Sequence, residues 1–168
     1  MEPEQIDELR SRIASEIGRD KDLILSGDKA RHFVGADFVV QYGGELFLLF
    51  ATAAGTYLWE KIKDRAAKAG KQAANSVWTA VAKKLSGAPN DAEHETDAKQ
   101  VAHIKDVDKG LQQLGTELES AYIEDFLRAG QGAVEARLRR DHFSDAKARR
   151  IAAAVAREVK QRVASGHV

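Results

Sequence analysis

The pattern in this chain that most resembles a metal-binding site is a run of four carboxylates at alternate positions: Asp91, Glu93, Glu95 and Asp97. A calcium-binding loop presents oxygen ligands at such a spacing, but it also needs a glycine at position six and a bidentate glutamate at position 12. Those two positions hold Thr96 and Ala102. We therefore interpret the segment as a solvated linker whose carboxylates cap a helix, and we expect no metal site.

Nucleophiles and histidines do not form a catalytic pattern either. The chain has five histidines and no cysteine, so it offers no thiolate nucleophile and no disulfide framework. His142 lies close to Ser144 and Asp145, but a Ser-His-Asp site is assembled by geometry across a fold and not by neighbouring positions. The simpler interpretation is a loop in which Ser144 caps a helix. We expect no enzymatic activity, no cofactor and no small-molecule substrate.

Basic residues gather in the C-terminal part of the chain, where they could contact a phosphate backbone. The candidate basic face consists of Arg139, Arg140, Arg149 and Arg150. Phe143 is the aromatic residue in this region, which leaves little for a base to stack on. A net charge of zero also differs from the basic balance of a dedicated nucleic-acid binder. Nucleic-acid binding is therefore our third hypothesis for the function.

Charge alternates along the chain in four blocks. Residues 1–56 have a net charge of −4 and residues 57–87 of +5, while residues 88–125 have −7 and residues 126–168 have +6. Such blocks are typical of helices that pack on complementary neighbours, within one molecule or between copies. We expect the C-terminal basic face to pair with the −7 block, and we expect self-association to depend on salt.

The longest uncharged run lies between Glu45 and Glu60 and contains 14 residues. As a helix it would reach about 21 Å, against about 30 Å of bilayer hydrocarbon, so it is too short for a standard transmembrane span. In a chain of which 31% is charged, this run is the natural centre of a core. The residues assigned to this core or membrane segment are Leu46, Phe47, Leu48, Leu49, Phe50, Tyr57, Leu58 and Trp59.

A membrane-active function can be argued from the same run. Ala51 and Gly55 form a small-x-x-x-small pair, which allows close helix approach in membranes. Tyr57 and Trp59 stand where an interfacial belt would place them, and lysines come after them. A hairpin over residues 33–59 that is released from a bundle is therefore the alternative. We prefer a buried core helix, because such helices are far commoner than inserting ones of this length.

Residues 37–50 can be interpreted as a helix or as a β-hairpin. Two apolar runs flank Gly43 and Gly44, which is a recognised hairpin signal. We favour a helix, because the second run continues into an alanine-rich helical stretch and a single hairpin has no further strand to pair with. A short β-hairpin near residues 37–50 is the alternative.

Helical periodicity covers most of the remaining chain. We expect a first helix that ends at Gly18, a long helix over residues 56–86, an amphipathic stretch over residues 101–127 that ends at Gly130–Gly132, and a last helix that begins after Ser144. Together these elements predict a mainly α protein, a compact bundle of about five or six helices around an apolar central helix. We expect one helical domain over residues 1–168, in which residues 86–97 link two helical halves.

The leading hypothesis is a non-enzymatic interaction or assembly protein that self-associates or binds a helical partner. Its candidate contact surfaces are two heptad-like seams, formed by Ile6, Leu9, Ile13, Val101, Ile104, Leu111, Leu114 and Leu118. The alternative is a pore-forming or membrane-disrupting effector that exposes residues 33–59. The acidic, polar N-terminus lacks the pattern of a signal peptide, so we expect a cytoplasmic protein with conditional membrane association.

Overall fold

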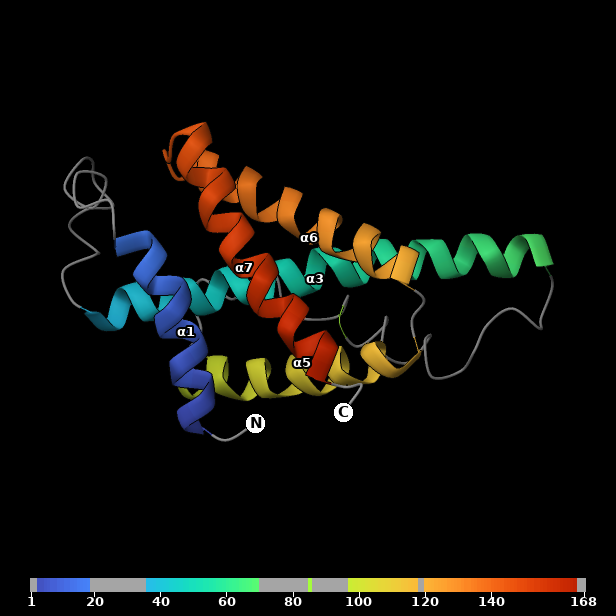
Figure 1. The fold of residues 1–168 in the computed structure, drawn as a ribbon, viewed down its shortest axis with the longest axis horizontal. Coiled ribbons are helices and arrows are strands. Elements are labelled where there is room, and N and C mark those ends of the chain that lie inside the picture. Colours follow the sequence, from blue (N-terminus) through green and yellow to red (C-terminus); the bar gives the residue numbers. More distant parts are fainter. Residues whose placement is uncertain (1–2, 19–35, 70–84, 86–96, 118–119, 166–168) are drawn as a thin grey trace.

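The computed structural model describes residues 3–18, 36–69, 85, 97–117 and 120–165, which form a bundle of helices (Figure 1). The described helices are α1 (Pro3–Gly18), α3 (Ala36–Ala69), α5 (Asp97–Glu117), α6 (Ser120–Arg140) and α7 (Asp145–Ser165). No residue in these ranges belongs to a β-strand. The prediction of a helical bundle is therefore confirmed. Most of the expected linker, residues 86–96, lies outside the described part.

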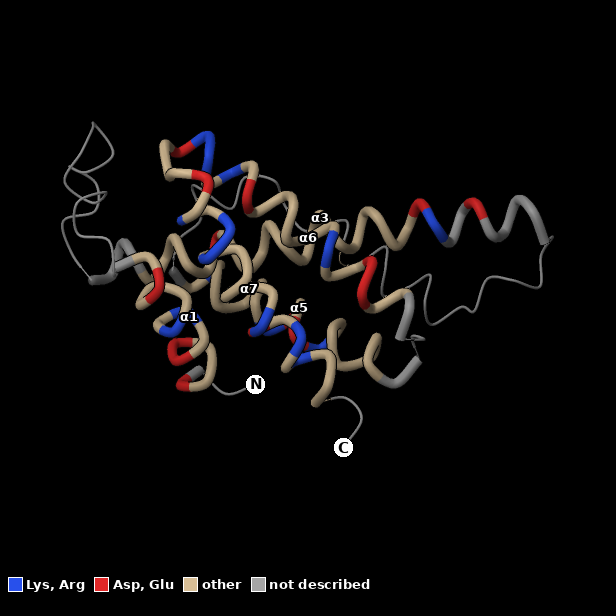
Figure 2. Tube along the Cα trace, turned by 45° about the horizontal axis from the view of Figure 1, so that its top comes forward, with Lys and Arg blue, Asp and Glu red and all other residues tan. Residues whose placement is uncertain are grey.

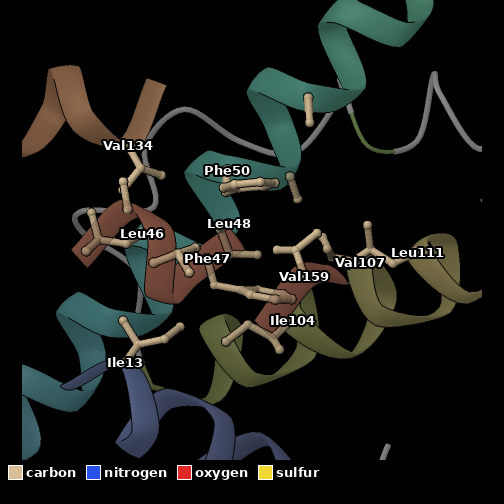
Figure 3. Packing of buried hydrophobic residues seen from close by; sticks show 14 of the residues in the cluster. Ile13, Leu46, Phe47, Leu48, Phe50, Ile104, Val107, Leu111, Val134 and Val159 are labelled. Atoms are coloured by element: carbon tan, nitrogen blue, oxygen red, sulfur yellow. The ribbon is translucent and has the colours of Figure 1, made fainter. Parts of the chain in front are cut away.

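The apolar run lies at the centre of the bundle, in α3. This helix begins at Ala36 and includes the first part of the helix expected over residues 56–86; residues 70–84 lie outside the described part. It contacts α1, α5, α6 and α7 (Figure 1). Phe47 and Phe50 are fully buried among residues from these helices, as Figure 3 shows. Burying a side chain of this kind contributes about 1.5–3 kcal/mol. The expected apolar central helix is thus confirmed.

Helix α3 is continuous through Gly43 and Gly44, so the alternative of a β-hairpin near residues 37–50 is wrong. Both glycines are buried where other helices come close. A Cβ atom on Gly43 would lie 2.9 Å from the backbone oxygen of Arg10 in α1, and a Cβ atom on Gly44 would overlap the side-chain amide of Gln100 in α5. The glycine pair therefore makes room for two neighbouring helices and does not mark a turn.

Helix α6 is continuous through Gly130–Gly132, so the expected break there is also wrong. Gly130 packs on the ring of Phe50, which a Cβ atom at this position would overlap. The amphipathic stretch expected over residues 101–127 is instead divided between α5 and α6. Gly130 thus lets α6 approach the central helix closely.

The turn between α6 and α7 is closed by its own backbone. The N–H of Phe143 donates to the carbonyl of Leu138 (3.0 Å), and the N–H of His142 donates to the carbonyl of Arg139 (3.0 Å). This is a Schellman motif, in which His142 takes the left-handed position with a φ of 72°. Helix α7 then begins after the predicted N-cap, Ser144, whose hydroxyl accepts a hydrogen bond from the N–H three residues later (3.4 Å). His142 and Ser144 therefore shape this turn.

Candidate functional site

The apolar segment identified from the sequence lies mostly in the core. Its buried members are at most 3% exposed and comprise Leu46, Phe47, Leu48, Phe50 and Leu58. Its half-buried members are Leu49, Tyr57 and Trp59. Within the part of the chain that the structure describes, no helix combines the length and the apolarity that crossing a membrane requires.

Ala51 and Gly55, the pair expected at a close helix approach, are both buried in α3. A close approach that the sequence analysis did not identify joins α5 to α7. There Gly115 lies against the backbone carbonyl of Val163, and a Cβ atom on the glycine would overlap that carbonyl. The two helix backbones can therefore meet only because this position has no side chain.

The two seams that were expected to contact a partner are used inside the chain. Their buried members are at most 1% exposed and comprise Ile6, Leu9, Ile13, Ile104, Leu111 and Leu114. Val101 is half-buried, and Leu118 lies outside the described residues. Helices α1 and α5 pack with the buried members of the seams on the other helices of the bundle.

The candidate basic face is partly neutralised within the chain. Arg139 Nε lies 3.0 Å from a carboxylate oxygen of Asp145. Arg150 donates a hydrogen bond to the backbone oxygen of Glu16 in α1 (3.2 Å), and its Nε lies 3.7 Å from the carboxylate of the same residue. Arg139, Arg140 and Arg149 are exposed, whereas Arg150 is half-buried. Fewer guanidinium groups are therefore available to phosphates than the sequence alone suggests.

A buried polar cluster joins α3 to the end of α6, and the sequence analysis did not identify it. The Tyr42 hydroxyl donates to Asp141 Oδ2 (2.7 Å), and Arg137 Nε donates to the same oxygen (2.9 Å). Arg137 also donates to Glu45 Oε2 (3.4 Å), so one guanidinium lies between two carboxylates. The three charged side chains are 5–14% exposed. The only sequence signal for this cluster is the i,i+4 spacing of Arg137 and Asp141.

This polar cluster fixes how α6 lies along α3. Burial raises the pKa of Tyr42, and the hydrogen bond to Asp141 raises it further, so the phenol stays protonated and remains a donor. The rings of Tyr42 and Phe143 also stack, with centroids 6.4 Å apart. Removing one member of such a buried charge cluster leaves the other members uncompensated. The cluster therefore specifies one arrangement of the two helices.

A second buried carboxylate, Asp108 of α5, faces Arg162 of α7. Asp108 is fully buried, accepts a hydrogen bond from Gln112 (2.9 Å) and lies 3.7 Å from Arg162 Nε. Arg162 of the +6 block therefore contacts a carboxylate of the −7 block, whereas Arg150 and Arg137 of the same +6 block contact carboxylates of the −4 block. Burial raises the pKa of Asp108, which Arg162 only partly offsets. No group of three or more histidines and carboxylates that could hold a metal ion occurs among the described residues.

A polar groove of about 350 Å³ lies between α1 and α7. At its edge Arg12 forms a two-pronged contact with Glu158, with Nε donating over 2.7 Å and a terminal nitrogen over 3.0 Å. The hydrogen bond from Arg12 to Glu158 raises the pKa of the arginine. The Nη1 atom of Arg12 also lies 3.2 Å from the Oε1 atom of Glu8. Further lining side chains are Ile13, Ser15, Glu16, Ala154, Arg157 and Gln161.

The last turns of α3, residues 60–69, extend beyond the start of α6, and no other described helix runs beside them in either view (Figures 1 and 2). We call these residues the projecting end. Glu60, Lys61 and Asp64 are exposed on it. The ammonium group of Lys61 lies 5.7 Å from the centre of the Tyr57 ring, at the base of the projecting end.

Half-buried aromatic and aliphatic side chains of α3 and α6 lie at the level of the base of the projecting end. The contacts of Gly130 with Phe50 and of Arg137 with Glu45 show that α6 runs antiparallel to α3. Residues two turns further along each helix toward the projecting end therefore lie at the same level. These residues, which we call the collar, are Tyr57, Trp59, Tyr122 and Ile123, and all four are half-buried.

Comparisons of the chain with protein-family models, with curated proteins and with solved structures found no match. The function is therefore inferred from the residues and surfaces of this chain.

Proposed function

We propose that this protein is a non-enzymatic helical assembly protein that associates with further copies of itself through the projecting end of α3 and the collar. The observation that carries this proposal is a charged helix end with half-buried aromatic residues at its base. Tyrosine and tryptophan are enriched at protein–protein interfaces, because they bury much area at a small entropic cost and keep a polar group. The seams are less suited to this purpose, since six of their eight residues are buried within the bundle.

A membrane-active effector ranks second, because of the energy that the release of residues 33–59 would require. Five side chains of the apolar segment are at most 3% exposed. At about 1.5–3 kcal/mol each, their exposure would cost about 8–15 kcal/mol. This equals the whole stability of a typical domain, about 5–15 kcal/mol. Release of α3 would therefore amount to unfolding of the bundle. Nucleic-acid binding ranks third, since part of the basic face is paired.

The proposal is tested by the mass of the purified protein in sedimentation velocity at low and high salt. We expect species heavier than the 18.4 kDa monomer at low salt, and a shift toward monomer at high salt. A monomer at every salt and protein concentration would overturn the proposal.

Two substitutions one residue apart on α3 localise the contact. Tyr57→Ala removes an aromatic side chain of the collar, and we expect it to weaken the association at least tenfold, which corresponds to about 1.4 kcal/mol. Thr56→Ala is the matched control. Its hydroxyl donates to the backbone oxygen of Thr52 within α3 (2.8 Å), and the substitution removes no aromatic side chain, so association should be unchanged. Equal effects of the two substitutions would exclude the collar as the contact.

A further inference from the structure

Helix α7 carries an excess of positive charge that the other described residues do not fully neutralise. It contains six basic and two acidic side chains. Both carboxylates are paired within the chain, Asp145 with Arg139 and Glu158 with Arg12. We propose that the exposed side of α7 docks on the anionic surface of a phospholipid bilayer while the helical bundle stays folded. This inference goes beyond the proposed self-association and does not depend on it.

Three exposed cations of α7 are available to a partner: Arg149, Arg157 and Lys160. Arg157 and Lys160 form no ion pair or hydrogen bond with any residue that the structure describes. Arg149 donates to the backbone oxygen of Asp145 in its own helix (3.3 Å), which leaves its charge uncompensated. Helical spacing places the three cations on one side of α7, with the short side chains of Ala153 and Ala156 between them. Figure 2 shows the basic residues along α7.

The groove between α1 and α7 adds to this positive surface. The two carboxylates in its lining are paired, Glu158 with Arg12 and Glu16 with Arg150. Arg157 also lines the groove and has no such partner among the described residues, so the uncompensated charge of the lining is positive. Guanidinium groups bind phosphate oxygens well, and a groove of about 350 Å³ has room for a lipid phosphate beside this arginine.

Helix α5 extends the set of cations next to α7. Asp108 of α5 lies 3.7 Å from Arg162 of α7, and Lys105 and Lys109 are exposed within one turn of Asp108. Neither lysine pairs with a described residue. Asp106 is exposed beside them, so the two lysines and this aspartate have a net charge of +1. The positive surface therefore continues from α7 onto the neighbouring helix.

A second copy of this chain offers no matching acidic surface within the described ranges. The exposed carboxylates that have no partner there lie one on each of four helices: Glu4, Asp64, Asp106 and Glu124. A cluster of cations cannot meet four such scattered charges in one contact. The anionic partner is therefore sought outside the described part of the chain.

The residues of α7 favour a bilayer over a nucleic acid. Helix α7 contains no aromatic residue, so a single strand would find no ring on which its bases could stack. A bilayer that contains anionic lipids requires only positive charge at its surface, where each lysine or arginine strengthens binding about fivefold. Cations separated by alanines satisfy this requirement.

Co-sedimentation of the full chain with lipid vesicles tests the inference. One set of vesicles contains phosphatidylcholine and phosphatidylserine in equal amounts, and the other contains phosphatidylcholine alone. We expect binding to the first set only, and we expect salt to weaken it as the Debye length falls from about 10 Å at 0.1 M to about 3 Å at 1 M. A dye inside the vesicles should stay there, because the bundle remains folded. Equal binding to both sets, or release of the dye, would overturn the inference.

Two double variants localise the contact. Arg157→Gln with Lys160→Gln removes two cations from the exposed side of α7, and we expect it to weaken binding to the anionic vesicles about twentyfold. The matched control, Lys61→Gln with Arg128→Gln, makes the same change in net charge on exposed positions of α3 and α6. It should weaken binding less than about threefold, because charges away from the contact are screened. Far-UV circular dichroism melts verify that both variants are folded.

Equal effects of the two double variants would overturn the inference, since binding would then follow net charge and not the α7 surface. Tighter binding to a duplex DNA fragment than to the anionic vesicles, at the same phosphate concentration, would identify a nucleic acid as the partner and would also overturn it. Sedimentation velocity without vesicles keeps the two proposals separate. A monomer that still binds the vesicles would remove the self-association alone, and an assembly that ignores them would remove the membrane contact alone.

Discussion

Gly130 and Gly132 lie two residues apart on α6, and the same substitution at these positions is expected to change stability in opposite directions. In the interior of an exposed helix, alanine is more favourable than glycine by about 0.5–1 kcal/mol. Gly132 is exposed, and a Cβ atom there would meet nothing within 4 Å. Gly132→Ala is therefore expected to raise the free energy of unfolding by about that amount.

At Gly130 the same added methyl group meets the core. It would overlap three ring atoms of Phe50, a side chain that is fully buried in α3. Either the ring must leave its position or α6 must move away from α3. Inserting a methyl group into a well-packed core costs about 1–3 kcal/mol, which exceeds the gain in helix propensity. Gly130→Ala is therefore expected to lower the free energy of unfolding by about 1–2 kcal/mol.

Urea unfolding followed by far-UV circular dichroism and extrapolated to water would measure both changes. A double variant, Gly130→Ala with Phe50→Leu, tests the cause. Because leucine leaves room for the methyl group, the double variant should lose less stability than the two single losses added together. If Gly130→Ala stabilises the protein as much as Gly132→Ala does, α6 does not pack closely on the Phe50 ring and the reasoning is refuted.

Three further predictions use the same unfolding measurement. Phe50→Ala should cost about 3–5 kcal/mol and the half-buried Leu49→Ala clearly less, whereas equal losses would contradict the central position of α3. Arg137→Met should cost about 3–5 kcal/mol because it leaves two buried carboxylates without a cation, while Arg139→Met, on the exposed side, should cost at most about 1 kcal/mol. Because burial raises the pKa of Asp108, the folded state binds the proton of this carboxyl group more tightly than the unfolded state does. The ionised group therefore lowers the free energy of unfolding at neutral pH. This destabilisation decreases as the pH falls through the folded-state pKa. The Asp108→Asn variant should therefore exceed the wild type in stability at pH 7 by a margin that shrinks on acidification; a margin that grows would reverse the sign assigned to this group.

The helical fold could be predicted because periodicity and apolar runs report burial directly. Ile6, Leu9 and Ile13 recur at helical spacing and are all buried in the structure. The absence of charge between Glu45 and Glu60 correctly indicated the central helix. These inferences need only the sequence pattern, since an apolar stripe or run must be buried away from water whichever helix packs on it.

The roles of several glycines could not be predicted, because turn and helix-break signals depend on nearby sequence positions and take no account of a second helix packed on the glycine. Gly43, Gly44 and Gly130 resemble turn or break signals, but in the structure each gives room to a residue distant in the sequence. The buried cluster of Tyr42, Glu45, Arg137 and Asp141 escaped notice for the same reason, as its hydrogen bonds span up to 99 residues. Such contacts depend on how the helices cross, which periodicity does not specify.

The seams that the sequence suggested as partner surfaces show that an apolar pattern alone does not indicate function. An apolar stripe indicates that a helix face is covered, but it does not indicate whether the cover is the same chain or another one. Here α1 and α5 bury their stripes within the bundle, and the surface that these described helices leave outside is largely charged. An interface made from such surfaces gains little from apolar burial beyond the collar, so it must rely on complementary charge, which is individually weak and screened by salt. Any self-association of this folded chain is therefore expected to be reversible and controlled by ionic strength.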